Sequence, residues 1–412
     1  MLTRFILASG ATNLADGVAV VVWAWAATLL TRDPFLVALV PVALRLPWFL
    51  MALPAGVVTD RVDRRRLILA MDVVRALAFA VVAGAVVLAG PLPPAPVEGV
   101  GVPWLFAVML GAALVVGGAE VFRDNAAQTM LPALVGAERL EVANGRLWSV
   151  ELIGNALVGP ALGAALIGVA LVLPFALNSG AYAVAVLLLL GLRGAFRPVR
   201  EGAADWRAEL AEGARFLMRA PLLRVLAVVT GVWNLLHQMV VVALVLHAQE
   251  TLGLSAAAYG LVLAGGAVGG IAGSLLGGRV VARLGPARTA QWMLAASAPA
   301  FAGVALAGDA VVLAVMLGLF EFTGMVWNLV SVSHRQRVIP DRLLGRVNSL
   351  YRLLAWGMMP LGLVLSGAVM GWAEGVVARP VALVLPLWIA AVGAGVLAAL
   401  GWRAIGRGFA GS

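Results

Sequence analysis

The chain contains 412 residues, of which 63% are hydrophobic and 12% charged, and its formal net charge is +9 at neutral pH. This composition excludes an ordinary soluble globular protein and is typical of a chain that crosses a lipid bilayer several times. Cysteine and lysine are both absent, which excludes disulfides, thiolate metal sites and a phosphate-binding loop that depends on lysine. We expect a protein that is not an enzyme, carries no metal or organic cofactor and binds no nucleic acid.

Apolar stretches of about 20 residues, the length needed to cross a bilayer, recur along the whole chain. Twelve are expected, at 5–30, 35–58, 67–88, 104–122, 147–171, 174–192, 222–247, 256–278, 289–306, 310–333, 348–372 and 381–402. The first is too long for a cleaved signal peptide and a second span follows at once, so we interpret it as a retained helix. The predicted fold class is an all-α polytopic membrane protein.

Arginine distribution predicts the orientation of these spans. If the N-terminus lies inside, only Arg32 and Arg379 fall in outer loops, as the positive-inside rule requires. Both termini are then cytoplasmic, and we expect a monomer that crosses the cell (inner) membrane. The polar stretch 193–221 carries apolar residues at helical spacing, which predicts an amphipathic linker helix on the inner surface. It separates a six-helix bundle at 1–192 from a second at 222–412.

The two predicted bundles repeat one another in sequence. The segment Ser9-Gly10-x-x-Asn13-Leu14-x-Asp16 aligns with Thr230-Gly231-x-x-Asn234-Leu235-x-His237. Because each bundle holds an even number of helices, the two repeats run parallel to each other.

A charged segment from Gly56 to Arg66 separates the second and third apolar runs. Its loop pattern is carried by five residues: Gly56, Asp60, Arg61, Arg64 and Arg65. This pattern resembles the loop between helices 2 and 3 of the major facilitator superfamily, with Asp63 where that family often has glycine. The resemblance implies a fold of twelve helices in two parallel repeats. It also implies a gating role, in which the loop braces the two halves when the inner side is closed. The alternative is a charge cluster that only sets topology.

A glycine and proline pattern in the fifth predicted span is formed by Gly159, Pro160 and Gly163. It resembles the Gly-Pro-x-x-Gly signature of antiporters in the superfamily and predicts a kinked face that another helix can approach closely. Glycine-rich faces are also common in membrane helices generally. The arginine found in the fourth helix of many drug/proton antiporters is not present between 104 and 118.

Charged side chains deep inside a span are costly and are functional candidates for that reason. Asp16 lies near the middle of the first span, and Arg45, at mid-depth in the second, is its expected partner. If the two are paired, both stay charged and Asp16 carries protons poorly. If Asp16 is unpaired, burial favours its protonated form and it can serve as a proton site.

A second set of candidates lies in the second bundle. Glu321 is central in the tenth span with Asn328 on the same face, and no base is near it in sequence, so we expect it to exchange protons. In the seventh span Asn234, His237 and Gln238 are expected to share a face. A lone histidine is also compatible with simple packing.

The remaining candidates carry weaker signals. Glu151 and Arg352 lie about one turn inside their spans and form ion pairs or reach the interface, and Asp72 with Arg75 is expected to form a local ion pair within one helix. Possible cavity residues are Asn13, Asn234, Gln238, Trp233, Asn328 and Met325.

Over nearly its whole length the chain resembles the bacterial exporter branch of the superfamily, which includes macrolide efflux proteins and the enterobactin exporter. The resemblance implies a secondary transporter that exports amphipathic small molecules by rocker-switch alternating access, with protons as the coupling ion. One alternative is a lipid or lysolipid flippase of the same fold, which movement of lipid headgroups would reveal. Another is a membrane receptor or assembly factor without transport, which the absence of substrate flux would reveal.

Overall fold

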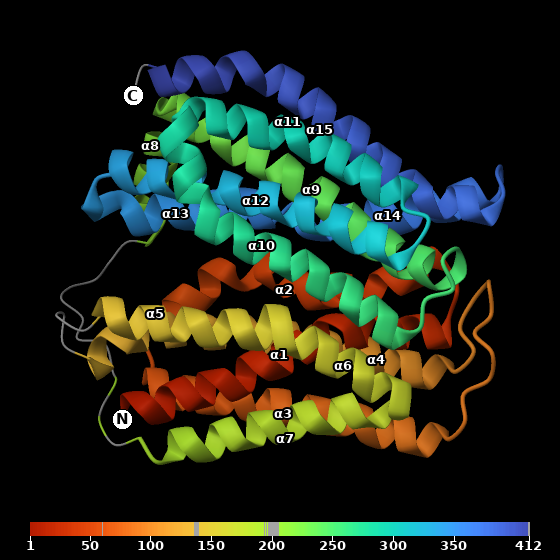
Figure 1. Cartoon of the computed structure of the whole chain (residues 1–412). Helices are drawn as coiled ribbons and strands as arrows, with labels where there is room; N and C mark the ends of the chain where they lie inside the picture. The colour runs from red at the N-terminus through yellow and green to blue at the C-terminus, as the bar shows by residue number, and fades with distance from the viewer. Residues whose placement is uncertain (60, 136–139, 193, 195, 197–205, 411–412) are drawn as a thin grey trace. The chain divides into compact units, whose positions relative to one another are not determined.

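The structure is a computed structural model that describes residues 1–59, 61–135, 140–192, 194, 196 and 206–410. Within these residues all regular structure is helical (Figure 1). Eleven of the described helices are long and apolar enough to cross a membrane. The prediction of an all-α polytopic membrane protein is therefore confirmed. The helix α11 (Pro286–Leu306), which coincides with the ninth predicted span, is not among the eleven, so the count of twelve and the orientation remain predictions.

The chain divides into two compact units, Met1–Glu201 with Leu254–Ala264, and Gly202–Gly253 with Gly265–Ser412. The helices of the first unit are α1 (Leu2–Leu30), α2 (Pro34–Thr59), α3 (Arg64–Ala89), α4 (Pro103–Leu134), α5 (Leu140–Glu151), the π-helical η2 (Leu152–Val158), α6 (Gly159–Val169) and α7 (Val172–Leu190). Within this unit α3 packs against α4 and α7, and α1 packs against α7, η2 and α6.

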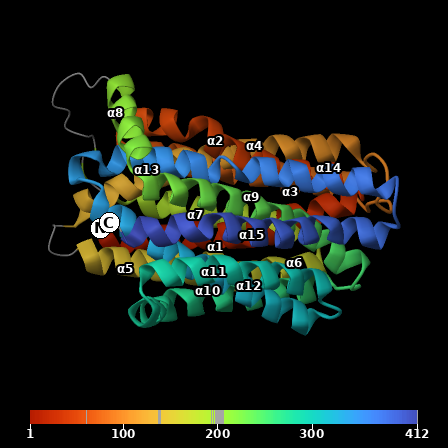
Figure 2. The same ribbon diagram turned by 90° about the horizontal axis from the view of Figure 1, so that it is seen from above.

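The second unit holds the remaining helices. They are α8 (Trp206–Arg219), α9 (Pro221–Glu250), α11, α12 (Ala310–Val338), α13 (Asp341–Trp356), α14 (Met359–Glu374), α15 (Arg379–Ala410) and the part of α10 (Ala256–Leu284) from Gly265 onward. The helix α8 packs on α13 around an apolar cluster that includes Leu217, Leu343 and Val347. In each unit the long helices lie side by side along their lengths (Figure 2).

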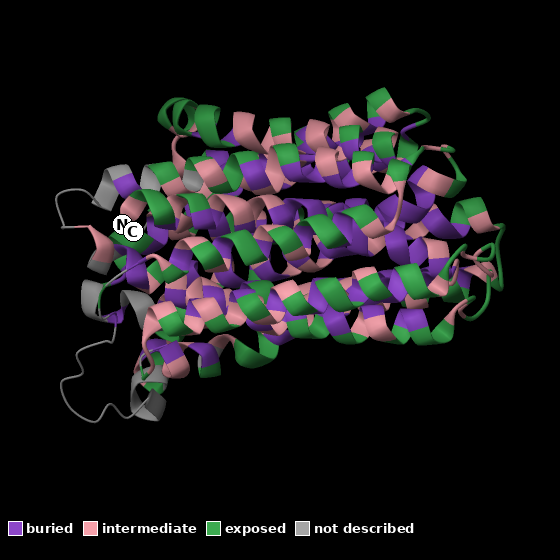
Figure 3. Cartoon of the chain, turned by 90° about the horizontal axis from the view of Figure 1, so that it is seen from below, coloured by how far each residue is buried: buried purple, intermediate pink, exposed green. Residues whose placement is uncertain are grey.

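Apolar residues lie on the outside of the bundles as well as inside them. Figure 3 shows buried and exposed positions alternating along single helices, and the exposed positions include Leu77, Leu88, Leu187, Leu275 and Leu400. Exposed leucine is expected where a helix faces lipid, because only the backbone, and not the apolar side chain, must be shielded from hydrocarbon.

The fifth span of each repeat is interrupted. In the first unit the α-helix gives way to the π-helical η2 before Gly159 and Pro160, and in the second α13 ends at Trp356 and α14 begins at Met359, followed by Pro360. Proline removes a backbone donor and disfavours a regular helix before it. The prediction of an irregular fifth helix thus agrees with the structure in the first unit, and a related break exists in the second.

Candidate functional site

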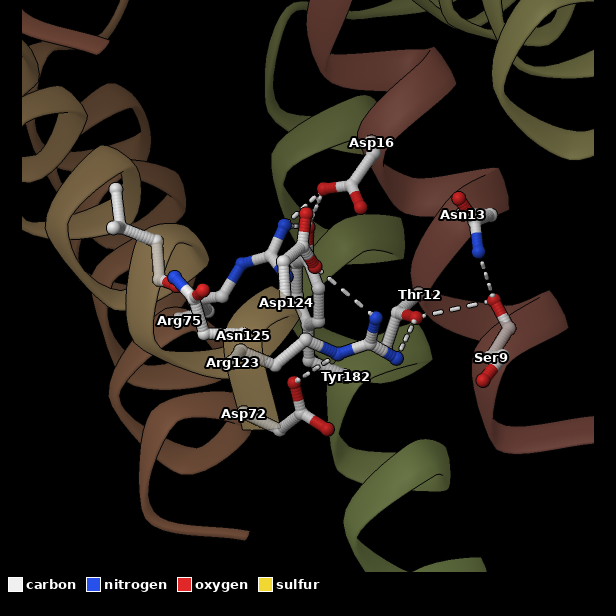
Figure 4. A network of polar contacts seen from close by, with 11 residues as sticks. Ser9, Thr12, Asn13, Asp16, Asp72, Arg75, Arg123, Asp124, Asn125 and Tyr182 are labelled. Atoms are coloured by element: carbon white, nitrogen blue, oxygen red, sulfur yellow. Dashed lines mark hydrogen bonds and ion pairs between the residues drawn. The ribbon is translucent and has the colours of Figure 1, made fainter. Parts of the chain in front are cut away.

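The first unit contains a group of buried and half-buried polar side chains that we call the first polar centre, formed by Asp16, Asp72, Arg75, Arg123, Asp124 and Tyr182 with Thr12 (Figure 4). These side chains come from α1, α3, α4 and α7. The helices α1 and α7 pack against each other. Polar side chains between them are shielded from water, so they need hydrogen-bond partners within the unit.

Asp16 is paired, although not with the predicted partner. Arg75 donates from Nη2 to Asp16 Oδ1 and, at 2.6 Å, to the hydroxyl oxygen of Tyr182. The Tyr182 hydroxyl in turn donates to Asp16 Oδ1 at 2.6 Å. Arg75 is fully buried, and a buried guanidinium needs a carboxylate partner to offset its loss of water. The prediction that Arg45 pairs with Asp16 is wrong, because α3 brings Arg75 to the middle of α1 whereas Arg45 is exposed.

Arg123 is the second buried guanidinium of this centre. Its Nη2 donates to Thr12 Oγ1 at 2.8 Å, its Nη1 donates to Asp124 Oδ1 at 3.3 Å, and its Nε lies 3.7 Å from Asp72 Oδ1. The predicted local pair of Asp72 with Arg75 is therefore wrong, because each residue faces a different helix. The fourth predicted span ended at 122, but α4 continues to Leu134. The helix therefore does contain a basic residue, Arg123, which lies beyond the segment 104–118.

Two further acids lie close to this centre. Glu120 of α4 is half-buried and is within electrostatic range of Arg45 and Arg75. Glu151, the last residue of α5, is exposed and is within electrostatic range of Arg123 and Asp124. Sequence reasoning did not single out Glu120, although this residue lies inside the predicted span 104–122. It also did not single out Asp124, which lies in the part of α4 beyond 122.

The second unit brings together two predicted residues, and with their neighbours we call them the second polar centre. Nε2 of His237 lies 3.4 Å from Glu321 Oε1, across α9 and α12. The His237 ring stacks on Trp233 with a centroid distance of 5.5 Å and on Phe320 at 5.0 Å. His237 is 23% exposed and Glu321 35%, so both side chains are reachable from outside the core.

Glycines allow Glu321 to fit where it does. The helix α10 passes α12 so closely that a Cβ at Gly269 would strike the backbone of Gly318. A Cβ at Gly266 would lie 3.7 Å from Cγ of Glu321. The small-residue face of α10 therefore packs against Cβ and Cγ of Glu321. The Oε1 atom of Glu321 lies toward His237 of α9 instead.

The predicted amide residues mainly serve packing within their units. Asn13 donates to the Ser9 carbonyl at 2.8 Å in its own helix, and Asn234 donates to the Ala355 carbonyl at 2.9 Å. Gln238 is buried, and its Cβ lies against Gly362. The predicted common face of the seventh span is thus divided, because Asn234 and Gln238 contact α13 and α14 whereas His237 contacts α12.

Met325 and Asn328, predicted as cavity residues, lie farther along α12. The Met325 side chain packs against Gly270 and Gly273 of α10, and Asn328 is exposed.

A hydroxyl network that sequence reasoning missed lies in the second unit. The Tyr351 hydroxyl donates to the Leu226 carbonyl at 3.0 Å and lies 2.8 Å from the hydroxyls of both Thr230 and Ser331. Arg335 stacks over the Tyr351 ring at 3.8 Å. It also donates to Asn348 Oδ1 at 3.0 Å. Arg352 is stacked on Trp356 at 4.2 Å.

The loop residues predicted to form a gate divide into three groups. Asp60 lies outside the described residues. Gly56 has no atom within 4 Å of the position of a Cβ, and Arg61 is exposed. Arg64 and Arg65 reach helix ends, because Arg64 donates to the Thr129 carbonyl and Arg65 donates to the carbonyls of Leu189 and Leu190.

Asp63, which departs from the family pattern, has a structural role. It caps α3 by accepting from Arg66 N at 3.0 Å, and its other oxygen accepts from Phe196 N at 3.0 Å. A carboxylate at this position satisfies a free amide and favours the positive end of the helix dipole. The loop therefore stabilises the end of α3 within the first unit.

The glycine motif of the fifth helix lies against α1. A Cβ at Gly159 would lie 2.5 Å from Gly17 Cα, and one at Gly163 would lie 2.8 Å from the Val18 carbonyl oxygen. Pro160 is also buried. The close approach therefore involves Gly17, the residue that follows Asp16, and it fixes the depth of that carboxylate.

Residues 5–363 match the family model described as "Major Facilitator Superfamily". The chain is 28% identical to the multidrug efflux pump Tap of Mycolicibacterium fortuitum over 94% of its own length and 92% of that protein. It is similar in fold to a point mutant of the nucleoside transporter NupG, with a TM-score of 0.77, 13% identity and coverage of 98% and 99% of the two chains. A bacterial homologue of the iron transporter ferroportin in its inward-facing state gives a TM-score of 0.72 at 17% identity, with 98% of both chains covered.

Proposed function

We propose, from the premise that this chain belongs to the Major Facilitator Superfamily, that it exports amphipathic small molecules in exchange for protons. The superfamily match and the multidrug efflux relative support a transporter with a small-molecule substrate. The solved structures are below 25% identity and support the fold alone. The direction, the coupling ion and the substrate class are our proposal.

The observation that carries the proposal is the pair formed by His237 and Glu321, in which the His237 ring stacks on Trp233 and Phe320. An imidazole and a carboxylate 3.4 Å apart can share a proton or hold one each. Both side chains are partly exposed, so protons can reach them. An acid–base pair between two membrane helices is a functional candidate, because placing ionisable groups inside the membrane costs free energy.

One ring beside this pair is half-buried and can meet a flat ligand. Trp233 stacks on His237 with a centroid distance of 5.5 Å, and the buried ring of Phe320 packs against both at 5.3 Å and 5.0 Å. Aromatic faces attract organic cations and stack with flat rings. A cationic amphipath that approaches Glu321 would compete with the proton for the same carboxylate. This competition would couple release of one to binding of the other.

The mechanism that we propose is alternating access, in which the sites are open to one side of the membrane at a time. A superfamily transporter built from parallel repeats moves by rocking of its halves. We place the protein in the cell membrane, acting as a monomer.

The test is transport of ethidium, a fluorescent amphipathic cation, by the purified full chain in liposomes. A pH gradient should drive ethidium movement in the unaltered protein, and Glu321→Gln should abolish that movement while ethidium exchange without a gradient persists. Asp309→Asn is the matched control, because Asp309 is a helix cap that accepts from Val311 N at 2.8 Å and asparagine caps helices equally well.

Gradient-driven movement that is the same in Glu321→Gln as in the unaltered protein would remove Glu321 from the coupling step. An unaltered protein that moves ethidium equally with and without a pH gradient would overturn proton coupling itself. Movement of a fluorescent lysophospholipid in place of ethidium would overturn the proposed substrate class.

A further inference from the structure

Asp72 of the first polar centre is a buried carboxylate without a hydrogen bond. Its side chain is 0% exposed, and neither of its oxygens has a hydrogen-bond partner in the described part of the chain. Arg123 Nε forms an ion pair with Asp72 Oδ1 at 3.7 Å and also makes no hydrogen bond in the described part of the chain. A fully buried carboxylate that accepts no hydrogen bond is more costly when charged than when neutral.

Charges around Asp72 leave one acid in excess. Nη2 of Arg75 is bonded to Asp16 and Tyr182, and among the described residues Arg123 is the base that forms an ion pair with both Asp72 and Asp124. Of these two acids Asp124 accepts a hydrogen bond from Arg123 and its side chain is 34% exposed. Asp72 accepts no hydrogen bond in the described part of the chain and its side chain is 0% exposed. One positive charge cannot offset two carboxylates in a bundle interior.

We infer that Asp72 is a proton-binding site of the first unit, separate from the His237–Glu321 pair and linked to α1 through Arg123. The inference rests on the proposed function only in its link to transport, because proton binding at Asp72 can be measured without a substrate. A metal cation does not suit this position, since hard cations need several oxygen ligands and the facing group is a guanidinium.

The geometry also indicates what the proton controls. When Asp72 is neutral, Arg123 stays on Thr12 and Asp124, as in the structure. When Asp72 loses its proton, its charge attracts the unpartnered Nε across a gap slightly longer than a hydrogen bond. Arg123 then weakens its bond to Thr12, which lies one helical turn before Asp16 on α1. Proton binding at α3 therefore changes a contact between α4 and α1.

Other charged groups around Asp72 do not replace this role. The helix α3 packs against α4 and α7, and the groups with electrostatic influence on Asp72 are Arg123 and Asp124 from α4, Asp16 from α1 and Arg75 from α3 itself. Tyr182 of α7 is occupied by Arg75 and Asp16. Two acids and two bases thus surround Asp72. Arg75 also has donors without a hydrogen-bond partner, Nε and Nη1, but among the described residues Arg123 is the base that forms an ion pair with Asp72.

The first experiment is infrared spectroscopy of the full chain in liposomes at neutral pH. The carbonyl band of protonated carboxyl groups should be weaker in Asp72→Asn than in the unaltered protein and should be unchanged in Asp309→Asn, and the same difference should be present when Glu321→Gln is added to each. Thr12→Val removes an acceptor from Arg123, frees it to pair with Asp72, and should reduce the band. A band that is unchanged in both Asp72→Asn and Thr12→Val would overturn the inference.

The second experiment follows ethidium movement in the same liposomes. Asp72→Asn should lose movement driven by a pH gradient and retain exchange, and a sodium gradient should drive nothing in any variant. If the band is weaker in Asp72→Asn while the unaltered protein shows no proton-driven movement, the site stands and the proposed function fails. If the unaltered protein is proton-driven and Asp72→Asn is equally so, the link from this site to transport fails. Movement driven by sodium that Asp72→Asn abolishes would assign the site to sodium instead.

Discussion

The two units place different polar groups at matching positions of their repeats. Ser9 and Asp16 on α1 correspond to Thr230 and His237 on α9. Around α1 the structure has two buried arginines facing carboxylates, whereas around Thr230 it has hydroxyl groups centred on Tyr351. The helical framework is compatible with either arrangement.

This difference teaches what each kind of polar centre requires. Arg75 and Arg123 face carboxylates, which offset the cost of burying a cation. Arg335 of the second unit, 8% exposed, lies on the Tyr351 ring and an amide oxygen instead. The polar groups around Asp16 thus depend on charge balance, whereas those around Tyr351 depend on aromatic stacking and on hydrogen bonds without a carboxylate.

The largest expected effect comes from removing one arginine from each unit. Arg75→Ala should destabilise the protein by about 3–5 kcal/mol, because it leaves Asp16 without its counter-charge. Arg335→Ala should cost about 1–3 kcal/mol, since it removes a hydrogen bond and a stacking contact but leaves no carboxylate behind. Unfolding of the purified variants in detergent measures both changes, and equal losses would contradict the comparison.

A smaller effect should follow from removing one hydroxyl from each unit. Tyr182→Phe deletes a hydrogen bond to the charged Asp16 and should cost about 1.5–3 kcal/mol. Tyr351→Phe deletes neutral hydrogen bonds to Thr230, Ser331 and the Leu226 carbonyl. Its cost should be nearer about 1 kcal/mol, because the two remaining hydroxyls can bond to other groups. The reverse order in detergent unfolding would show that the polar groups around Asp16 do not depend on charge balance.

The third test perturbs backbone spacing beside the charges. A Cβ at Gly17 would lie 2.5 Å from the Gly154 carbonyl oxygen and 2.7 Å from that of Asn155. Gly17→Ala should therefore cost about 1–3 kcal/mol through overpacking and displace Asp16. Gly56→Ala is the matched control, because it is also helical and meets nothing within 4 Å. It should be neutral or stabilise by about 0.5–1 kcal/mol, and similar losses for the two variants would refute the close-approach explanation.

Sequence reasoning predicted the helices well because apolar length is a local property. The fourth span shows its limit, since polar residues led us to end it at 122 whereas α4 continues to Leu134. A helix can carry Arg123 and Asp124 when neighbouring helices supply partners, and those partners are not visible in a local window. The break before Met359 was likewise not predicted.

The candidate residues show the same division. Asp16, His237 and Glu321 were identified because a charged or titratable group in an apolar run is conspicuous by itself. Their partners were harder to identify, because Arg75 is 59 residues from Asp16 and His237 is 84 residues from Glu321. Asp72 was assigned to a neighbour on its own helix, since helical spacing was the only geometry at hand.

The sequence by itself determined that this chain is a multi-helix membrane protein with a few charges in its spans, and it contains a sequence repeat from which we predict two similar halves. The length and hydropathy of the apolar segments and the repeated sequence motifs decide those properties, and each can be read directly from the linear sequence. Only the tertiary structure decided which charges are matched and which carboxylate is left without a hydrogen bond. That outcome depends on the depth and rotation at which helices distant in sequence pack against one another.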